Sequence, residues 1–255
     1  MRVRSHTITA LRYRAGFSLI EMAVVLMILG FVLGGLLVSL GQTTENPRRT
    51  DATSQLKRIE EALYGFAQAN GRLPCPANNT SAGAEAPVGG GNCTVSHGFV
   101  PAATLGLSGA VNTDGLLTDP WGNPFRYSVA NASNGSGRSY TSTAGLATTF
   151  STPPFPTAGN PGSLRICDDA PCVVPTGVIA DSIPAVVLSM GANWGSFTSP
   201  EQVANAGNTT LGGYRITNTN DFVSAGYNET DFDDIITWLS PNILFSRMIS
   251  AGKLP

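Results

Sequence analysis

Two sets of side chains in this 255-residue sequence have residue types and spacings that could do chemistry. The first set consists of four cysteines: Cys75, Cys93, Cys167 and Cys172. The second consists of five acids between residues 216 and 246, with no Lys or Arg among them: Asp221, Glu229, Asp231, Asp233 and Asp234. Thiols can form disulfides or bind zinc, and an oxygen-rich loop suits a hard cation.

Catalytic chemistry has little support in the sequence. Of the two histidines, only His97 lies beyond residues 1–16, and no surrounding pattern marks it as a base. No nucleophile-elbow motif accompanies a serine, and no glycine-rich phosphate loop occurs in a suitable context. Without residues 1–16 the chain has 11 basic residues against 17 acidic ones, a net charge of −6. We therefore expect neither an enzyme nor a nucleic-acid-binding protein.

The first 41 residues have the pattern of a membrane segment. Phe17 to Gly41 is a 25-residue apolar run with a single charge, at Glu21. At about 1.5 Å per residue it exceeds the roughly 30 Å hydrocarbon core of a bilayer. Four arginines and no acid occur in residues 1–16, so the positive-inside rule places that stretch in the cytoplasm. The run is too long for a secretory signal peptide, which leaves an ordinary signal anchor as the simplest interpretation.

Glu21 argues against an ordinary anchor. A carboxylate costs about 2.5–3.5 kcal/mol at the centre of a membrane helix, and the run contains no Lys or Arg to pair with it. The residues from Gly16 to Glu21, GFSLIE, closely resemble the processing site of type IV prepilins and type II secretion pseudopilins. This resemblance implies that prepilin peptidase cuts between Gly16 and Phe17 and methylates the new amino terminus. It also implies that the amino group of Phe17 pairs with Glu21 of a neighbouring subunit.

The resemblance implies an α+β fold of the type IV pilin-like kind. The residues themselves predict one long N-terminal helix kinked at Pro47. We expect residues 17–41 to form its transmembrane and filament-core half, and residues 42–70 its amphipathic half. From Thr50 to Asn70 apolar residues recur at helical spacing, which predicts packing against a head domain. These residues are Leu56, Ile59, Leu63 and Phe66. Gly71 then follows as a C-cap.

Residues 71–255 are expected to form an extracytoplasmic head, an antiparallel sheet with long loops. Four short apolar runs suit its strands: 125–130, 164–167, 173–180 and 184–190. The polar stretch between Tyr127 and Leu164 contains only Arg138 as a charge and predicts a long exposed insertion. The apolar residues after Asp233 recur at helical spacing, which predicts two short helices or turns interrupted at Pro241.

The cysteines fall in the part that this topology places in the periplasm. An oxidising compartment and an even count favour disulfides, and four cysteines permit three pairings. We favour Cys75 with Cys93 and Cys167 with Cys172, because each pair lies within one loop. A zinc site made from all four thiolates is the alternative, and the four-residue gap between Cys167 and Cys172 makes it the weaker one.

Two further segments resemble the same family. Asp119 to Tyr127, DPWGNPFRY, is similar to the D-x-W-G-x-P-x-x-Y loop that enters the sheet in major pseudopilins. Val186 to Asn193, taken with Asp231 to Ile235, resembles the strand and acidic loop that bind calcium in those proteins. The calcium ligands implied are Asp231, Asp233, Asp234 and Ser189. Asn193 stands where the family typically has Asp, so an acidic turn capping a helix near Asp233 explains the residues equally well.

We expect a structural subunit assembled into a type IV pilus or a type II secretion pseudopilus. Its large head favours a minor role, at the tip or as an initiator. The resemblance implies as partners prepilin peptidase, other pilin or pseudopilin subunits, and an inner-membrane assembly platform with a cytoplasmic ATPase. It implies a single-pass protein of the bacterial inner membrane that later joins a pseudopilus or an extracellular pilus. No cofactor beyond the possible calcium ion is expected.

Two alternatives remain open from the sequence. The head could act mainly as a binding or adhesion module for DNA, a secreted substrate or a surface. The net negative charge and the isolated Arg138 argue against DNA. The chain could also be a membrane-anchored extracytoplasmic enzyme, although no catalytic constellation is visible.

Overall fold

The computed structural model describes residues 18–130, 139–151, 164–197, 199–217, 219–228 and 231–255; within α1, the side chains of residues 34–44 are not described. The chain divides into two compact units, residues 1–46 and residues 47–255. One helix, α1 (Leu19–Asn70), has residues in both units and continues through Pro47 without ending there. A kink at Pro47 stays a prediction. The mixture of an N-terminal helix with an antiparallel sheet is consistent with a pilin-like fold.

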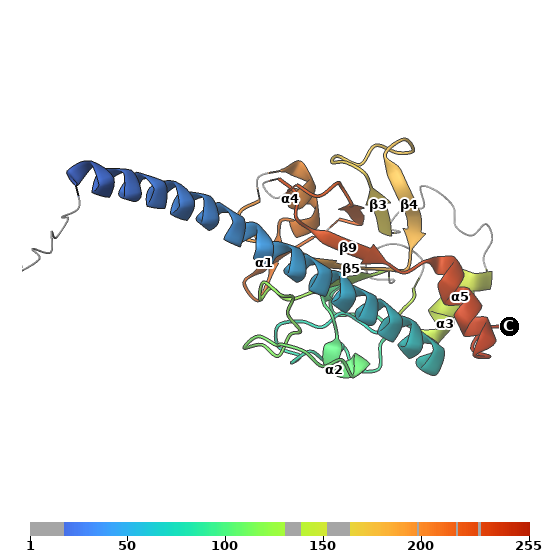
Figure 1. The fold of residues 1–255 in the computed structure, drawn as a ribbon. Helices are drawn as coiled ribbons and strands as arrows, with labels where there is room; N and C mark the ends of the chain where they lie inside the picture. Colours follow the sequence, from blue (N-terminus) through green and yellow to red (C-terminus); the bar gives the residue numbers. More distant parts are fainter. Residues whose placement is uncertain (1–17, 131–138, 152–163, 198, 218, 229–230) are drawn as a thin grey trace, which may run out of the picture. The chain divides into compact units, whose positions relative to one another are not determined.

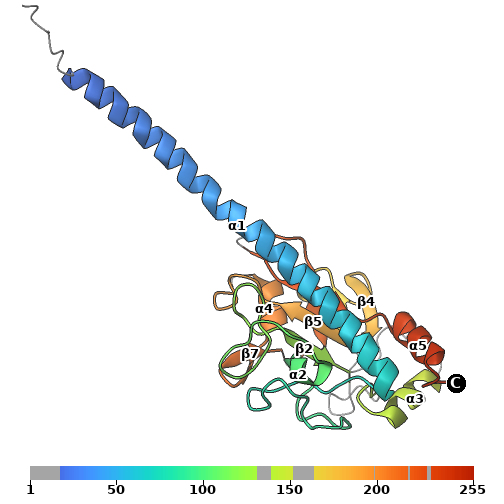
Figure 2. The same cartoon turned by 60° about the horizontal axis from the view of Figure 1, so that its bottom comes forward.

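The second half of α1 owes its position to one apolar stripe. Five of its buried residues, beside which buried Tyr64 lies, follow one another at intervals of three or four: Ala52, Leu56, Ile59, Leu63 and Ala67. This spacing keeps them on one side of an α-helix, which lies across the sheet of the head (Figure 1, Figure 2). Phe66, predicted in the stripe, is only partly buried, because Ala67 takes the inward position. Gly71 ends the helix with a left-handed φ of 71°, and its N–H bonds to the Ala67 carbonyl.

The central sheet has four antiparallel strands in the order β1-β2-β5-β9. Their bounds are β1 (His97–Phe99), β2 (Arg126–Val129), β5 (Ala185–Ser189) and β9 (Ile235–Trp238). Buried residues of β2 and β5 join the stripe of α1 in the main hydrophobic core. The predicted runs 125–130 and 184–190 correspond to β2 and β5.

A second sheet has the order β4-β3-β8, with β3 antiparallel to β4 and parallel to β8. Its strands are β3 (Leu164–Cys167), β4 (Val178–Ile183) and β8 (Asp221–Val223). The predicted strand 164–167 is β3 itself. The prediction 173–180 is wrong in its first half, because residues 173–177 form the turn that leads from the Cys167–Cys172 loop into β4. A separate hairpin joins β6 (Thr209–Leu211) to β7 (Tyr214–Ile216).

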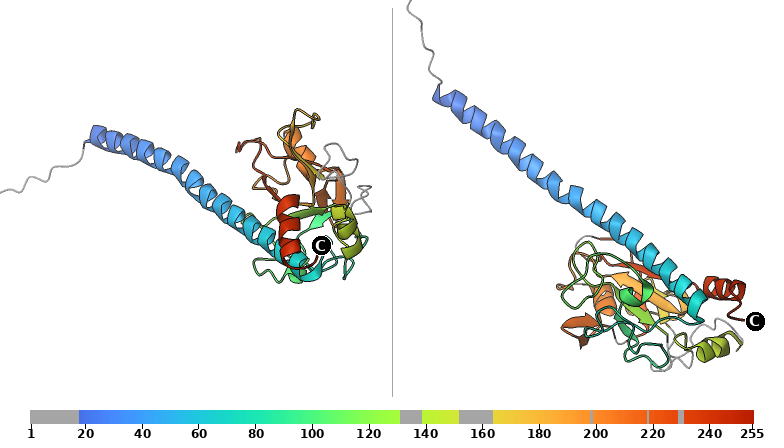
Figure 3. Two further views of the ribbon diagram at one scale, coloured as in Figure 1. Left: turned by 90° about the vertical axis from the view of Figure 1, so that its right-hand side faces the viewer. Right: turned by 90° about the horizontal axis from the view of Figure 1, so that it is seen from below.

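Four shorter helices complete the described chain: α2 (Ala102–Leu105), α3 (Thr143–Ser151), α4 (Pro200–Ala206) and α5 (Pro241–Ser250). Helix α5 lies beside the last turns of α1, near the C-terminus (Figure 3). The Arg247 guanidinium on α5 makes two hydrogen bonds to the Glu61 carboxylate on α1, at 2.7 and 3.0 Å. Buried Leu244 and Met248 of α5 belong to the main core.

Two predictions about the head are wrong. A helix does not begin near Asp233: residues 235–238 form β9, because pairing with β5 satisfies their backbone and suits the β-branched pair Ile235 and Ile236. The stretch between Tyr127 and Leu164 is also not exposed throughout. Tyr140 and Leu146 are fully buried, and Leu146 lies on helix α3. Residues 131–138 and 152–163 of that stretch lie outside the described residues.

Candidate functional site

The predicted processing site is only partly visible, since Gly16 and Phe17 lie outside the described residues. Glu21 occupies the first turn of α1, where its Oε2 accepts a hydrogen bond from the Ser18 N–H at 3.0 Å. The Ser18 hydroxyl in turn accepts one from the Ile20 N–H at 3.4 Å. A serine followed three residues later by a glutamate that bonds back to it is a capping box. The carboxylate therefore accepts one N–H at the start of the helix within its own chain, a role that was not predicted from the sequence.

The helix that follows Glu21 is apolar around its whole circumference. From Leu19 to Leu33, its large apolar side chains are each about half exposed or more, with Leu19 at 91% and Phe31 at 71%. A helix that is apolar on all sides is typical of a segment surrounded by other apolar groups. Among the described residues, no helix combines the length and the apolarity needed to cross a membrane. The rest of the predicted segment, Phe17 and the side chains of residues 34–41, lies outside the description.

The four cysteines form two disulfides, Cys75–Cys93 and Cys167–Cys172, with sulfur–sulfur distances of 2.02 and 1.89 Å. This is the pairing between neighbours that the sequence favours. Because no described cysteine is free, no thiolate is left for the alternative zinc site. The one described group with metal-ligand spacing, Cys167, Cys172 and Asp221, includes both sulfurs of the second disulfide.

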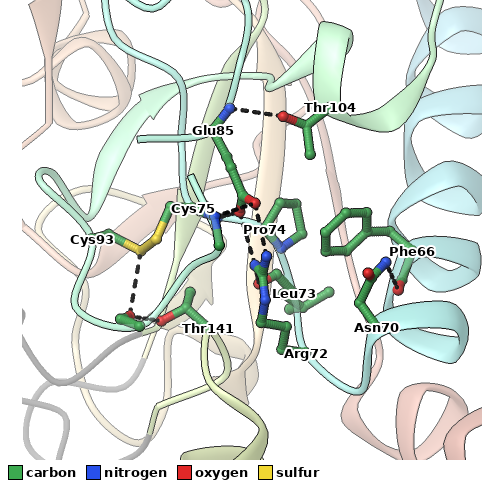
Figure 4. Close-up of polar contacts among 12 residues, drawn as sticks. Phe66, Asn70, Arg72, Leu73, Pro74, Cys75, Glu85, Cys93, Thr104 and Thr141 are labelled. Carbon is green, nitrogen blue, oxygen red and sulfur yellow. Dashed lines mark hydrogen bonds and ion pairs between the residues drawn. A yellow bond between two sulfur atoms is a disulfide. The ribbon is translucent and has the colours of Figure 1, made fainter. Parts of the chain in front are cut away.

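A buried ion pair supports the first disulfide (Figure 4). The Nη1 and Nη2 atoms of Arg72 donate to the Glu85 carboxylate, at 2.8 and 2.7 Å, and the side chains are only 11% and 4% exposed. The same carboxylate accepts the N–H groups of Cys75 and Gly89, each at 3.1 Å. All four bonds hold the segment that leaves α1. This pair could not be predicted from the sequence, because nothing local connects residues 72 and 85.

The Asp119–Tyr127 segment forms a tight turn, as its resemblance implies. Asp119 Oδ1 accepts the N–H groups of Trp121 and Asn123, and Oδ2 accepts the Ser189 hydroxyl at 2.5 Å. Burial raises the pKa of Asp119, and these hydrogen bonds only partly offset that effect. Asn123 completes the link by donating to the Gly191 carbonyl at 2.8 Å. The segment therefore ties the entrance of β2 to the end of β5.

The predicted calcium ligands form hydrogen bonds with other groups of the protein. Asp233 Oδ2 accepts the N–H groups of Ala192 and Asn193, at 2.6 and 3.1 Å. Gly191 makes this wrapping possible, because its φ is +64° and a Cβ there would lie 2.3 Å from Asp233 Oδ2. Ser189 donates to Asp119 instead of facing the acidic loop.

The acids of that loop also do not converge. Asp231 accepts from Asn228 and is exposed, whereas Asp234 accepts from Asn205 and is buried. Asp231, Asp233 and Asp234 form no shared group of metal ligands within the described ranges. The geometry therefore gives calcium no support, and Asp233 acts as a cap for the loop at the end of β5. The alternative of a helix N-cap is wrong, since a strand follows.

Asp234 gives the head a specific pH dependence. Burial raises the pKa of Asp234 from 3.8 to about 7, with a smaller contribution in the same direction from the negative charge of nearby Asp233. The folded chain therefore holds a proton between about pH 4 and pH 7 that the unfolded chain releases. The stability that this proton provides is complete below pH 4 and is lost as the pH rises through 7.

We expect Asp234→Asn to remove this loss. As the pH rises from 4 to 8, the free energy of unfolding of the variant minus that of the parent chain should increase by about 4 kcal/mol. Urea titrations of the full chain in detergent at several pH values measure the difference. Partly buried His97, whose pKa desolvation lowers to about 4, contributes equally to both chains. The exposed control Asp231→Asn should run parallel to the parent, and a parallel Asp234→Asn curve would contradict the assignment.

Helix α4 is another feature that was not predicted from the sequence. Its N-cap Ser199 accepts the Gln202 N–H at 3.2 Å, and Pro200 follows at the first position. A serine followed by proline and glutamate is a helix-start signal that could have identified it. Its buried residues Gln202 and Asn205 donate to Asp233 and Asp234.

Comparison with known proteins gives one match. Residues 11–37 match the prokaryotic N-terminal methylation motif. The chain carries the type IV pilin and pseudopilin signal. The motif contains Gly16, Phe17 and Glu21, and it implies a pilin-like subunit that is processed by prepilin peptidase and assembles with other pilin subunits. It ends within α1 and so does not extend into the head. No curated protein and no solved structure matches the chain.

Proposed function

We propose that this chain is a non-enzymatic structural subunit of a type IV pilus or a type II secretion pseudopilus. The observation that carries the proposal is the methylation motif at residues 11–37, placed at the start of a helix whose described apolar side chains are exposed on all sides. Such a surface needs apolar surroundings, either lipid or the same segment of neighbouring subunits. A helix satisfies its own backbone hydrogen bonds, so it can pass from one environment to the other.

The proposed mechanism begins with insertion of the precursor, its leader of residues 1–16 in the cytoplasm and its head in the periplasm. Prepilin peptidase removes the leader after Gly16, which creates an amino group on Phe17. In the single chain, the Glu21 carboxylate accepts the Ser18 N–H. On assembly, it gains the Phe17 amino group of a neighbour as a charged partner. An inner-membrane platform with a cytoplasmic ATPase then extracts subunits into a filament whose core is residues 17–41.

A minor position in the filament fits the head best. Loops, two disulfides and short helices enlarge residues 71–255 beyond what the central sheet and α1 require. A head of this size hinders close helical repetition, whereas a subunit at the tip or at initiation has fewer neighbours. We therefore place the chain among the minor subunits.

Intact mass of the full chain, produced with and without prepilin peptidase, tests the proposal. We expect loss of residues 1–16 and gain of one methyl group only when the peptidase is present. Gly16→Val should abolish both changes, while Gly65→Ala, at an exposed helical glycine with open space around it, should leave them intact. A chain that stays uncut, or is cut elsewhere, would restore the plain signal anchor. Product in sheared fibres would indicate a pilus, and processed product kept in the envelope a pseudopilus.

A further inference from the structure

A buried arginine lies on the face of the central sheet that points away from α1. Along β2, Tyr127 packs into the main core with α1, so its neighbour Arg126 points to the opposite face. The Arg126 guanidinium carbon lies 4.9 Å from the Phe99 ring centre and 5.4 Å from the Tyr214 ring centre. Two aromatic faces therefore enclose the guanidinium, one from β1 and one from the β6–β7 hairpin.

Two of the three guanidinium nitrogens of Arg126, Nε and Nη1, lack hydrogen-bond partners among the described residues. Only 6% of Arg126 is exposed, and its Nε and Nη1 are enclosed without any acceptor in the described structure. None of the three ion pairs found among the described residues includes it. Aromatic faces attract the positive charge. They do not accept hydrogen bonds from the guanidinium N–H groups, which point outward in the plane of the guanidinium. A buried donor of this kind ordinarily has a partner, because desolvation without one is costly.

Arg126 nevertheless keeps its charge. Burial lowers its pKa to about 10, and the nearby Tyr214 and Asp119 oppose that decrease. At neutral pH the side chain is therefore a cation. Its Nε and Nη1 therefore favour a hydrogen-bond acceptor that also carries a negative charge.

Arg126 lines a small cavity of about 10 Å³ on this face of the sheet. Its walls contain two arginines, Arg126 and Arg215, and two hydroxyl residues, Ser128 and Thr217. The other lining residues are uncharged: Gly98, Leu188, Asn205, Ile216 and Phe222. This volume admits about one water-sized particle. The cavity thus offers donors and positive charge without a carboxylate.

We propose that this cavity binds one small monovalent anion of the halide class, chloride under ordinary conditions, as the acceptor for the Arg126 guanidinium. A water molecule, which is smaller, could also accept these hydrogen bonds but would add no negative charge to that of Asp119. Larger organic anions do not fit the available volume. Because its lining residues come from β1, β2, β5, α4, the β6–β7 hairpin and β8, a bound anion joins these elements. The site is independent of the proposed role in filaments.

Thermal unfolding of the full chain in detergent tests the site, in sodium chloride and in sodium gluconate at equal ionic strength. We expect the midpoint temperature to rise with chloride, on the order of 3–5 °C for each tenfold increase above the dissociation constant, and not with gluconate. Arg126→Gln should abolish the difference between the two salts. Arg247→Gln, which removes an exposed arginine paired with Glu61, should preserve it.

Chloride-35 nuclear magnetic resonance of the parent chain keeps the test decisive if Arg126→Gln fails to fold. We expect the protein to broaden the chloride line, and bromide to reverse the broadening by competition while gluconate does not. Equal midpoints in both salts together with an unbroadened line would overturn the proposal and leave a water molecule as the occupant.

Discussion

Replacing Glu21 by Gln should leave leader removal intact and reduce incorporation of the subunit into filaments more than a hundredfold. Gln keeps the hydrogen bond that the Ser18 N–H donates to residue 21, since Glu and Gln both complete a capping box. It removes only the charge. Losing one partner of a buried charge pair costs about 3–5 kcal/mol, and about 1.4 kcal/mol corresponds to a tenfold change.

Two comparisons separate the assembly role of Glu21 from its capping role. Glu21→Leu removes both the charge and the cap, whereas Glu61→Gln changes an exposed carboxylate elsewhere on α1. Filament content is measured by quantitative immunoblots of sheared fibres or of the assembled envelope fraction, relative to processed subunit. If charge pairing matters, Glu21→Gln and Glu21→Leu fail alike and Glu61→Gln assembles. Normal assembly of Glu21→Gln beside failure of Glu21→Leu would show that the carboxylate only caps the helix.

Replacing Glu85 by Gln should lower the free energy of unfolding of the head by about 3–5 kcal/mol. The change leaves the buried Arg72 guanidinium without its anion and weakens the bonds from the Cys75 and Gly89 N–H groups. These contacts fix the chain where it leaves α1 at Gly71 and enters the Cys75–Cys93 loop. The effect should therefore exceed that of any surface charge on the head.

The chain contains a matched control for this prediction. Arg247 and Glu61 form a second pair with two hydrogen bonds, in which the side chains are 35% and 62% exposed. Glu61→Gln should cost less than about 1 kcal/mol, because water screens an exposed pair. Urea unfolding of both variants with the disulfides intact gives the two values. Equal losses would show that burial does not control the strength of the Arg72–Glu85 pair.

Features that depend on neighbouring residues could be predicted from the amino-acid order alone. A processing signal is a linear pattern, so GFSLIE could be identified without a fold, and the family motif bears it out. Helical periodicity is also local, which is why Leu56, Ile59 and Leu63 predicted the buried side of α1. The disulfide between Cys167 and Cys172 follows from a short separation in sequence. Each of these depends on residues that are neighbours before folding.

Features that depend on residues far apart in the sequence could not be predicted and became visible in the folded chain. The run after Asp233 had a spacing compatible with a helix, and pairing with β5, more than 40 residues earlier, made it a strand. The polar stretch around Tyr140 and Leu146 gave no local sign that these side chains complete the core. The sequence around Glu85 and Arg126 likewise contained no local sign that these charged side chains are buried. Burial and partner choice depend on long-range contacts, and a charged residue looks the same in sequence whether water or another chain segment surrounds it.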